Sequence, residues 1–352
     1  MQVKAYAAHQ CGGPMKPHTI ERRDIRDNDV EIEIMYSGIC HSDLHQINND
    51  WGGANYPLVP GHEIAGKVTK VGKNVTEFKV GDHAAVGCFV DSCLECDQCE
   101  GDHEQYCREE VVQTYSSKDP VGPEKYTSGG FSTHIVVREH FVLKVDKSLD
   151  LSKVPPMVCA GITTFSPLKE YNIGEGSRVG VIGIGGLGHM AVQLAAGLGA
   201  EVTAITRSND KAQEIDELGA KHSLLSTDKK AMKEAAGSFD LIIDTVPVKH
   251  DLDPYISLLD VRGVICIVGQ LGDSGNLNTG PLVFGERKIT GSLVGGIKLT
   301  QEVIDFCRDK QIYPMCESIN MENVNDALKR LEEGDVHYRF VIDMASMKDQ
   351  AA

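Results

Sequence analysis

The chain has 352 residues, enough for two domains with separate hydrophobic cores. Its hydrophobic content of 41% and charged content of 24% are ordinary for a globular protein, and no apolar stretch reaches the roughly 18 residues of a membrane helix. The net charge of −16 excludes a general nucleic-acid partner, because phosphate binding needs a basic surface. Since the start of the chain is too polar for a signal peptide, we expect a cytoplasmic protein that binds neither nucleic acid nor membranes.

Residues 1–153 are predicted to form a mostly-β domain. Residues 30–34 alternate apolar and polar side chains, as a half-buried strand does. Residues 66–72 and 81–87 are further strand-like segments with turn residues at their ends. Few long segments of this region show the hydrophobic periodicity of a helix, so we expect short strands separated by turns.

A dispersed set of possible metal ligands lies in this domain. Cys40 stands in Gly-Ile-Cys-His-Ser-Asp, and His62 precedes Glu63 in Pro-Gly-His-Glu. Catalytic zinc has three protein ligands and one open position, so the third ligand must come from elsewhere in the fold. Cys159 is a candidate, although its spacing fits a buried structural thiol equally well. Glu63 could ligate zinc when the substrate position is empty, and Asp43 could orient His62.

Ser42 and His45 follow Cys40 at short spacing. A hydroxyl and an imidazole can together relay a proton, which favours a catalytic role for both residues. The alternative for His45 is an ordinary surface or core histidine.

A second, compact set of ligands lies further along the chain. Its spacing is Cys-x2-Cys-x2-Cys-x7-Cys, and its members are Cys93, Cys96, Cys99 and Cys107. Structural zinc is held by four ligands in a closed tetrahedron, and closely spaced cysteines can surround it with little chain. Four unrelated free cysteines in a polar loop are the poorer interpretation, because free cysteine prefers burial. The sequence therefore predicts a structural zinc lobe.

The pattern changes near residue 154 to alternating strands and helices. Residues 178–182 form a continuous apolar run, as expected of a strand buried on both faces. A glycine turn, a helix over 190–198 and a second strand over 202–205 follow, with later strands at 241–243 and 264–268. Strands that alternate with helices predict βαβ units and a parallel sheet.

The glycine turn fits the pattern G-x-G-x-x-G between a strand and a helix. It consists of Gly183, Ile184, Gly185, Gly186, Leu187 and Gly188. In such turns the first glycine permits the tight bend, the second lets the backbone approach a pyrophosphate, and the third lets helix and strand pack closely. The helix N-terminus attracts the phosphate charge. This context favours a dinucleotide site over a bland glycine-rich turn.

The end of the second strand bears on which nicotinamide cofactor binds. An NAD site has an acidic residue there, whereas this strand ends in Thr206-Arg207-Ser208, with Lys211 one turn on. Glu201 lies at the other end of the strand. Hydroxyls and cations suit a 2′-phosphate and therefore favour NADP(H); the alternative is that Arg207 and Lys211 are solvated surface charges.

The chain closes with two predicted helices, 300–310 and 322–333, and a strand over 338–343. This stretch is expected to return to the first domain. The predicted domains are thus 1–153 together with 293–352, and 154–292.

Together these motifs resemble the zinc-dependent medium-chain alcohol dehydrogenases, and in particular their cinnamyl alcohol dehydrogenase-like branch. The matching segments, in the family's order, are Cys40-His41-Ser42-Asp43-Leu44-His45, Tyr56-Pro57-Leu58-Val59-Pro60-Gly61-His62-Glu63, Gly87-Cys88 before the four cysteines, and Cys159-Ala160-Gly161-Ile162-Thr163. The resemblance implies an α/β protein with a GroES-like catalytic domain and a Rossmann domain whose parallel sheet is doubly wound.

The resemblance also implies roles for single residues. Cys40, His62 and Cys159 would ligate the catalytic zinc, while His41 and Thr163 would contact the cofactor. The implied enzyme contains two Zn²⁺ per chain, uses NADP(H) and forms a homodimer or homotetramer. Its expected reaction interconverts primary alcohols and aldehydes, either cinnamyl or other aromatic and aliphatic ones. Alternatives are a polyol dehydrogenase of the same superfamily and a non-catalytic zinc protein that binds NADP(H).

Overall fold

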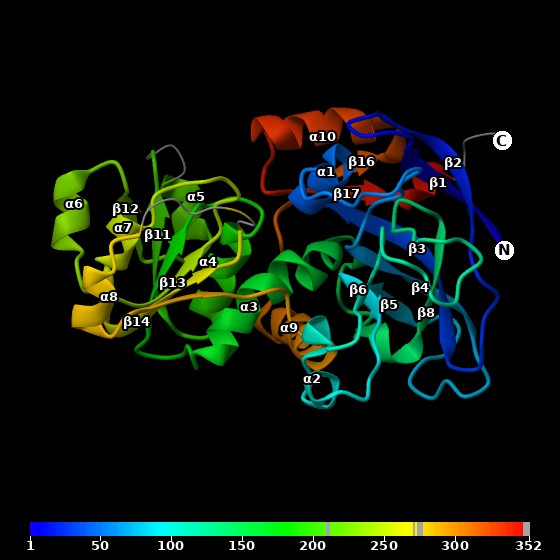
Figure 1. The fold of residues 1–352 in the computed structure, drawn as a ribbon, viewed down its shortest axis with the longest axis horizontal. Helices are drawn as coiled ribbons and strands as arrows, with labels where there is room; N and C mark the ends of the chain where they lie inside the picture. The colour runs from blue at the N-terminus through cyan, green and yellow to red at the C-terminus, as the bar shows by residue number, and fades with distance from the viewer. Residues whose placement is uncertain (209–211, 270–271, 273–276, 348–352) are drawn as a thin grey trace. The chain divides into compact units, whose positions relative to one another are not determined.

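The computed structural model describes residues 1–208, 212–269, 272 and 277–347. The chain divides into two compact units, which are described separately (Figure 1). The first unit comprises Met1–Cys159, Gly296–Arg308 and Tyr313–Ala352, and the second comprises Ala160–Gly295 and Asp309–Ile312. The domain boundaries expected at residues 153 and 293 stay predictions.

The first unit is built on a mixed sheet with the order β16-β17-β3-β4-β5-β9, and β8 also pairs with β3. A hairpin of β1 and β2 and a small ribbon of β6 and β7 complete its strands. The strands are β1 Gln2–Ala8, β2 Met15–Glu21, β3 Asp29–Ile39, β4 Ile64–Val71, β5 His83–Val86, β6 Phe89–Asp91, β7 Val112–Gln113, β8 His134–Arg138, β9 Leu143–Val145, β16 Cys316–Asn320 and β17 Arg339–Asp343. The helices are α1 His41–Asn48, α2 Asp97–Glu100, α9 Ile297–Lys310 and α10 Val324–Glu333.

The predicted strands of this unit are present, and the central one is longer than predicted. Residues 30–34 belong to β3, which is eleven residues long and pairs with β4, β8 and β17. The length matters because Cys40 follows directly at its end. The closing segment returns to this sheet through β17, which pairs antiparallel with β3.

The second unit has a six-stranded parallel sheet in the order β12-β11-β10-β13-β14-β15. Its strands are β10 Arg178–Ile182, β11 Glu201–Thr206, β12 His222–Leu225, β13 Phe239–Asp244, β14 Leu259–Ile267 and β15 Lys288–Gly291. Its helices are α3 Ala160–Glu170, α4 Gly188–Gly197, α5 Ala212–Glu217, α6 Lys229–Glu234, α7 Asp253–Ile256 and α8 Gly280–Gly285. The strand order reverses between β10 and β13, which is the switch point at which such sheets bind ligands.

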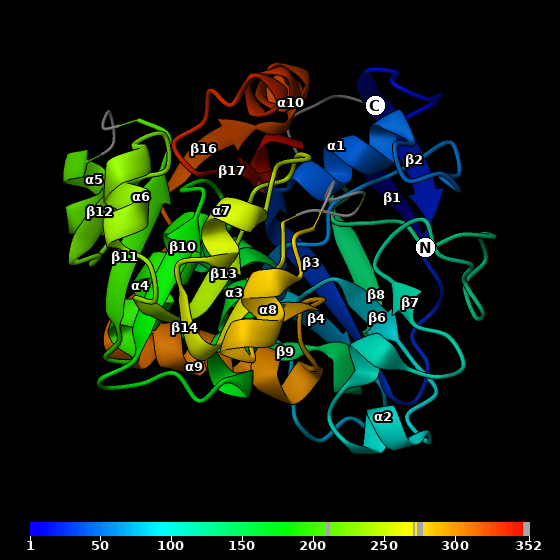
Figure 2. The same cartoon turned by 60° about the vertical axis from the view of Figure 1, so that its left-hand side comes forward.

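Helices flank this sheet in both views (Figures 1 and 2). Because both faces are covered, the central strands are almost wholly apolar, and Val179, Ile242 and Ile265 are fully buried. The predicted fold class, a mostly-β GroES-like domain with a Rossmann domain, agrees with the mixed sheet of the first unit and the parallel sheet of the second.

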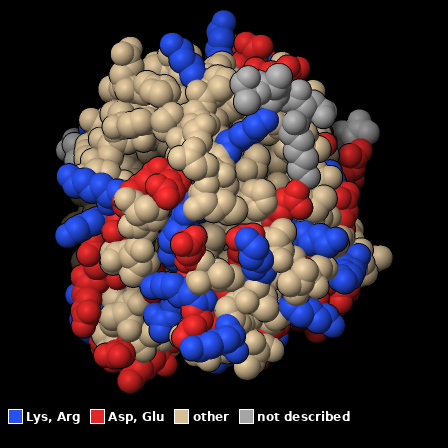
Figure 3. Space-filling view, turned by 90° about the vertical axis from the view of Figure 1, so that its right-hand side faces the viewer, with Lys and Arg blue, Asp and Glu red and all other residues tan. Residues whose placement is uncertain are grey.

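The surface agrees with the acidic composition. On the face shown in Figure 3, basic and acidic side chains are interspersed, without a continuous basic patch among the described residues. Among the described residues, no helix has both the length and the apolar character to cross a membrane.

Candidate active site and metal centres

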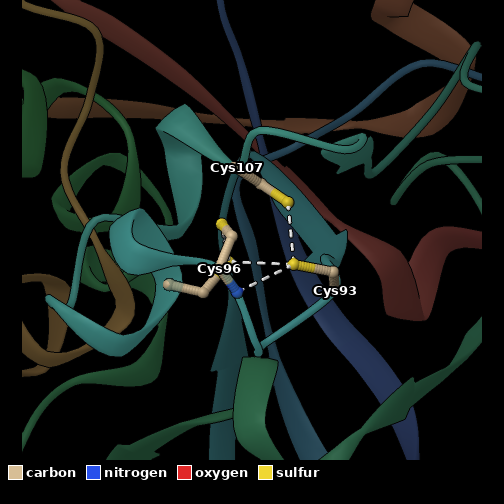
Figure 4. A group of neighbouring side chains, drawn as sticks. Cys93, Cys96 and Cys107 are labelled. Atoms are coloured by element: carbon tan, nitrogen blue, oxygen red, sulfur yellow. Dashed lines mark hydrogen bonds between the residues drawn. The ribbon is translucent and has the colours of Figure 1, made fainter.

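The four cysteines of the predicted lobe converge within one short segment. Figure 4 shows the Cys93 sulfur beside the Cys107 sulfur and the backbone N–H of Cys96. The Sγ–Sγ distances are 3.4 Å from Cys107 to Cys93, 3.8 Å from Cys93 to Cys99 and 3.5 Å from Cys96 to Cys99. Backbone N–H groups of Cys96 and Arg108 donate to the sulfurs of Cys93 and Cys96, each at 3.4 Å. Such donors stabilise thiolates, the form that binds metal.

This cluster fits a closed tetrahedral zinc site. All four sulfur atoms lie within 4.8 Å of one another. A tetrahedron with Zn–S bonds of about 2.3 Å has sulfur atoms about 3.8 Å apart, so the observed spacing leaves room for one ion. His103, the other possible ligand of this segment, is exposed, and its Nδ1 hydrogen-bonds the Gly101 carbonyl at 2.6 Å.

A buried carboxylate anchors the lobe to the rest of the first unit. Glu104, only 1% exposed, contacts His140 Nε2 at 2.7 Å and accepts from the backbone N–H of Ile297, the first residue of α9, at 3.1 Å. Lys298 and Asp102 form an ion pair at 2.7 Å beside it. The four-cysteine segment is therefore tied to the start of α9 through Glu104 and Asp102.

The dispersed ligands also come together, although they are far apart in sequence. Cys40, His62, Glu63 and Cys159 are all buried, and their ligand atoms lie within 4.8 Å of one another. The Cys40 and Cys159 sulfurs are 3.9 Å apart, and His62 Nε2 is 3.2 Å from the Cys159 sulfur. Two thiols and an imidazole at this spacing match the donor set of a catalytic zinc with three protein ligands.

Asp43 ties the ligand segments together. Its carboxylate is fully buried and accepts from the backbone N–H of Cys40 at 2.8 Å and of Gly61 at 3.0 Å. It also lies 3.3 Å from His62 Nδ1, which directs Nε2 of that ring toward Cys159. A single carboxylate thus caps the start of α1 and fixes the tautomer of a candidate metal ligand.

Glu63 occupies a buried position beside Arg339. Its oxygen Oε1 is 3.4 Å from Nη1 of Arg339, and neither of its oxygens has a hydrogen-bonding partner among the described residues. Burial raises the pKa of Glu63 to about 7, although the Arg339 charge opposes the shift. The space for this carboxylate exists because residue 38 is glycine: a Cβ there would lie 2.0 Å from Glu63 Oε2. A buried carboxylate with open coordination capacity beside the thiols suits intermittent metal ligation.

The two candidate relay residues lie on α1. Ser42 Oγ is 3.7 Å from the Cys40 sulfur, so the hydroxyl borders the ligand cluster. His45 lies one turn further along the helix, and its Nδ1 is 2.8 Å from Asp50 Oδ2. The Trp51 ring centroid is 5.0 Å from that of His45. His41 begins the same helix and is partly exposed.

In the second unit the glycine turn has the geometry expected of a dinucleotide site. Gly183 adopts a φ of +81°, which favours glycine, and a Cβ at Gly188 would lie 1.9 Å from the Gly183 carbonyl oxygen. A Cβ at Gly185 would meet nothing within 4 Å, so open space lies where the family pattern places the pyrophosphate. Leu187 caps α4, and Gly186 is partly exposed.

The residues predicted to recognise the adenosine phosphate lie at the end of β11. Arg207 and Ser208 are exposed, and the Thr206 hydroxyl donates to the Ser208 carbonyl at 2.8 Å. Glu201 lies at the opposite end of β11, where it contacts His222 at 3.2 Å. Lys211 lies outside the described residues. Thr163 is buried in α3 of the second unit.

Sequence reasoning missed three residues near the dispersed cluster. Arg339 enters from β17, whose place beside β3 no local pattern reveals. Asp50 follows His45 by five residues and could have been found as a partner in a helix-to-turn contact. Tyr115 lies far from His62 in the sequence, yet it is 6% exposed and its ring centroid is 5.8 Å from that of His62.

The fold and the two clusters define a zinc-binding dehydrogenase, and the comparisons agree. Residues 26–147 match the alcohol dehydrogenase GroES-like domain, and residues 186–309 match the zinc-binding dehydrogenase family. The chain therefore belongs to the zinc-dependent medium-chain alcohol dehydrogenases, and the predicted family, cinnamyl-type branch and enzyme class are confirmed.

Three relatives illustrate the likeness. The chain is 45% identical to a probable formaldehyde dehydrogenase of Bacillus subtilis, covering 98% of this chain and 99% of that protein. It is 46% identical to NADP-dependent alcohol dehydrogenase C 1 of Mycolicibacterium smegmatis, with the same coverage. Among solved structures, a cinnamyl alcohol dehydrogenase of Sorghum bicolor superimposes with a TM-score of 0.95 at 41% identity and covers 100% of both chains.

Proposed function

We propose that this enzyme interconverts primary alcohols and aldehydes with NADP(H), at the cluster of Cys40, His62 and Cys159. The observation that carries the proposal is the Ser42 hydroxyl, 3.7 Å from the Cys40 sulfur of that buried donor set. The NADP-dependent relative, similar along its whole length, supports the choice of cofactor. The lobe formed by residues 93–107 takes no part in the chemistry.

The proposed roles follow from the donor chemistry. Cys40, His62 and Cys159 would hold a zinc ion that would supply a Lewis acid for the substrate oxygen, and the glycine turn would hold NADP(H), which would supply or accept the hydride. Ser42 holds the proton of the substrate oxygen, and His45 exchanges that proton with water.

Asp50 positions His45 in this relay. An ionised carboxylate can only accept hydrogen bonds, so the 2.8 Å contact between Asp50 and His45 places a hydrogen on Nδ1 of the imidazole. In the neutral ring Nε2 then carries the lone pair and can receive a proton. Trp51 covers one face of the imidazole and limits its rotation.

Replacing Ser42 tests the relay. We expect Ser42→Ala to lower kcat by about 10²-fold or more while both zinc ions remain, because general acid–base catalysis contributes that much. Ser42→Thr keeps a hydroxyl and should retain more activity, and Ser148→Ala, at an exposed position, serves as the control. Near-normal turnover by Ser42→Ala would remove the relay from the proposal.

Arg207 tests the preference for NADP(H). We expect Arg207→Ala to lower kcat/KM for NADPH by about tenfold and to change kcat/KM for NADH little, because a guanidinium pairs with the 2′-phosphate. Lys221→Ala, at another exposed position of the second unit, is the matched control. An unchanged ratio of the two cofactors would exclude Arg207 from recognition.

The substrate is proposed to be an aldehyde of the aliphatic, benzyl or cinnamyl class. Turnover of such a panel with NADPH, compared with oxidation of a polyol such as sorbitol, distinguishes the proposal from a polyol dehydrogenase. Faster turnover of the polyol would overturn the assignment.

The enzyme is further proposed to form a homodimer through the edge of the second unit. In the part of the chain that the structure describes, strand β15 pairs only with β14, and on nearby α8 Phe284 is 94% and Val283 77% exposed. An unpaired strand edge and exposed apolar side chains favour association with a second copy. Phe284→Asp should shift the mass in light scattering toward one chain, whereas Val80→Asp, 62% exposed in the first unit, should not.

A cytoplasmic location is also proposed. All eleven cysteines are free, and thiols persist in reducing compartments. Fractionation of cells that express the protein would test this location, and recovery in an oxidising compartment would contradict it.

A further inference from the structure

A buried acid–base pair to which no role has been assigned lies at the switch point of the parallel sheet, beside the glycine turn. Asp244 is the last residue of β13, and His250 follows it in the next loop. The Asp244 side chain is fully buried and that of His250 is 17% exposed, with Nε2 and Oδ2 3.0 Å apart. The approach is bent, and neither atom has a regular hydrogen-bonding partner among the described residues.

The Nδ1 contact of His250 and the short Nε2–Oδ2 distance indicate that one proton is shared by the pair. His250 Nδ1 lies 2.9 Å from the carbonyl oxygen of Val248, which can only accept, so Nδ1 carries a hydrogen. In a neutral ring Nε2 would then be an unprotonated acceptor facing the acceptor oxygen of an ionised Asp244. Two lone pairs at 3.0 Å repel, so the contact is attractive only when one proton resides on either partner.

Burial of the pair favours the protonated form of Asp244. Burial raises the pKa of Asp244, although the neighbouring His250 opposes the shift. On the neighbouring strand β14, burial first and the nearby Asp244 second raise the pKa of the Cys266 thiol to about 12, so this thiol stays neutral. The Tyr255 ring of α7 lies 6.1 Å from the His250 ring, and the flanking Lys249 and Asp251 are exposed.

The loop closed by this pair packs on the glycine turn. Thr245 donates its hydroxyl to the carbonyl oxygens of Gly183 at 2.7 Å and of Ile182 at 2.9 Å. A Cβ at Gly183 would lie 3.1 Å from the Val246 side chain, and the backbone N–H of Val246 donates to Asp244 Oδ1 at 3.1 Å. The carboxylate that faces His250 therefore also fixes the residues that shape the dinucleotide turn.

We propose that Asp244 and His250 are positioning residues for the dinucleotide site, and that the proton they share holds the loop 245–250 against the glycine turn. The inference rests on the proposed binding of NADP(H) at that turn. When the pH rises and the pair loses its proton, the two acceptors repel, the loop loosens and the affinity for the dinucleotide falls. Asp244 and His250 thus affect the affinity for the cofactor through the loop 245–250, without a need to contact the cofactor themselves.

The dissociation constant of NADPH, measured from its fluorescence between pH 6 and 9.5, tests the proposal without turnover. We expect the wild-type Kd to rise by about tenfold toward high pH, the effect of losing one charge-assisted hydrogen bond. Asp244→Asn should bind with a pH-independent Kd near the wild-type low-pH value. Its amide can donate to His250 Nε2 while its oxygen still accepts from Val246, with no proton to lose.

Two further variants complete the test. His250→Leu removes the imidazole and should show the weak affinity at all pH values, while His222→Asn should behave as wild type, because His222 forms an exposed pair with Glu201 in the same unit. If Asp244→Asn showed the same pH dependence of the NADPH Kd as the wild type, the inference would be overturned. This outcome can be observed even if His250→Leu fails to fold. Absence of NADPH binding by the wild type at every pH would instead overturn the proposed function, and this inference with it.

Discussion

The two cysteine clusters of the first unit show how differently a chain can assemble similar ligands. The lobe collects its four sulfurs from fifteen consecutive residues, with the cysteines partly exposed and hydrogen-bonded by nearby backbone N–H groups. The dispersed cluster collects Cys40, His62 and Cys159 from three distant segments, in a fully buried position supported by Asp43 and Arg339. Local spacing in the sequence therefore suffices to bring the ligands of the lobe together, whereas the ligands of the dispersed cluster meet only through the tertiary fold.

The strongest test of this contrast removes one ligand from the dispersed cluster. We expect Cys159→Ser to lose one of two zinc ions, counted by elemental analysis, and to lower kcat/KM by roughly 10³-fold, since a Lewis acid contributes several kcal/mol. The melting temperature should change little. Cys11→Ser, at an exposed position, is the control, and full activity with one zinc lost would reverse the assigned roles.

The matching change in the lobe should have the opposite profile. We expect Cys96→Ser to lose one zinc and to lower Tm by about 5–10 °C, because a zinc held by four protein ligands contributes directly to the folding of the segment that surrounds it. The folded fraction should keep kcat within a few-fold of wild type. A large loss of kcat at unchanged Tm would show that the lobe takes part in the reaction.

Weakening the support of the dispersed cluster should have a smaller effect. Asp43→Asn keeps the size of the side chain but loses the charge that holds His62, and we expect it to weaken zinc binding at that cluster by about 10–100-fold. Competition with a chelator measures this affinity. Asp27→Asn, exposed in the same unit, should leave it unchanged.

The smallest expected effect concerns the lobe's anchor. Burial alone would raise the pKa of Glu104, but the hydrogen bonds from His140 and Ile297 outweigh it and keep the pKa below its ordinary value. Glu104 therefore stabilises the protein above that ordinary pKa, and the stabilisation disappears as the pH falls. Glu104→Gln should lower Tm by about 2–4 °C at pH 7 and by less at pH 4. Glu100→Gln, on the exposed side of α2, should have no effect at either pH.

The same contrast explains what could be predicted from the sequence. The lobe, the strand over 178–182 and the glycine turn follow from spacing and periodicity within short windows, and the structure contains all three. Cys159 could be placed only through the family resemblance, because its spacing from Cys40 has no local meaning.

Other features lay beyond such reasoning because they depend on tertiary packing. Arg339 reaches Glu63 only because β17 pairs with β3, across nearly the whole length of the chain. The Asp244 and His250 pair was missed because a loop of ordinary composition gives no sign of where it folds back.

The packing of Gly38 against Glu63 has a consequence for sequence variation at these two positions. Glycine is a poor strand former, yet it stands within β3, two residues before Cys40, where any side chain would collide with the Glu63 carboxylate. The two positions are therefore expected to vary together among homologous chains: an alanine at 38 would be tolerated only where residue 63 has shortened. A glycine at this strand position in a homologous sequence would then indicate that the position of Glu63 still carries a carboxylate beside the metal ligands.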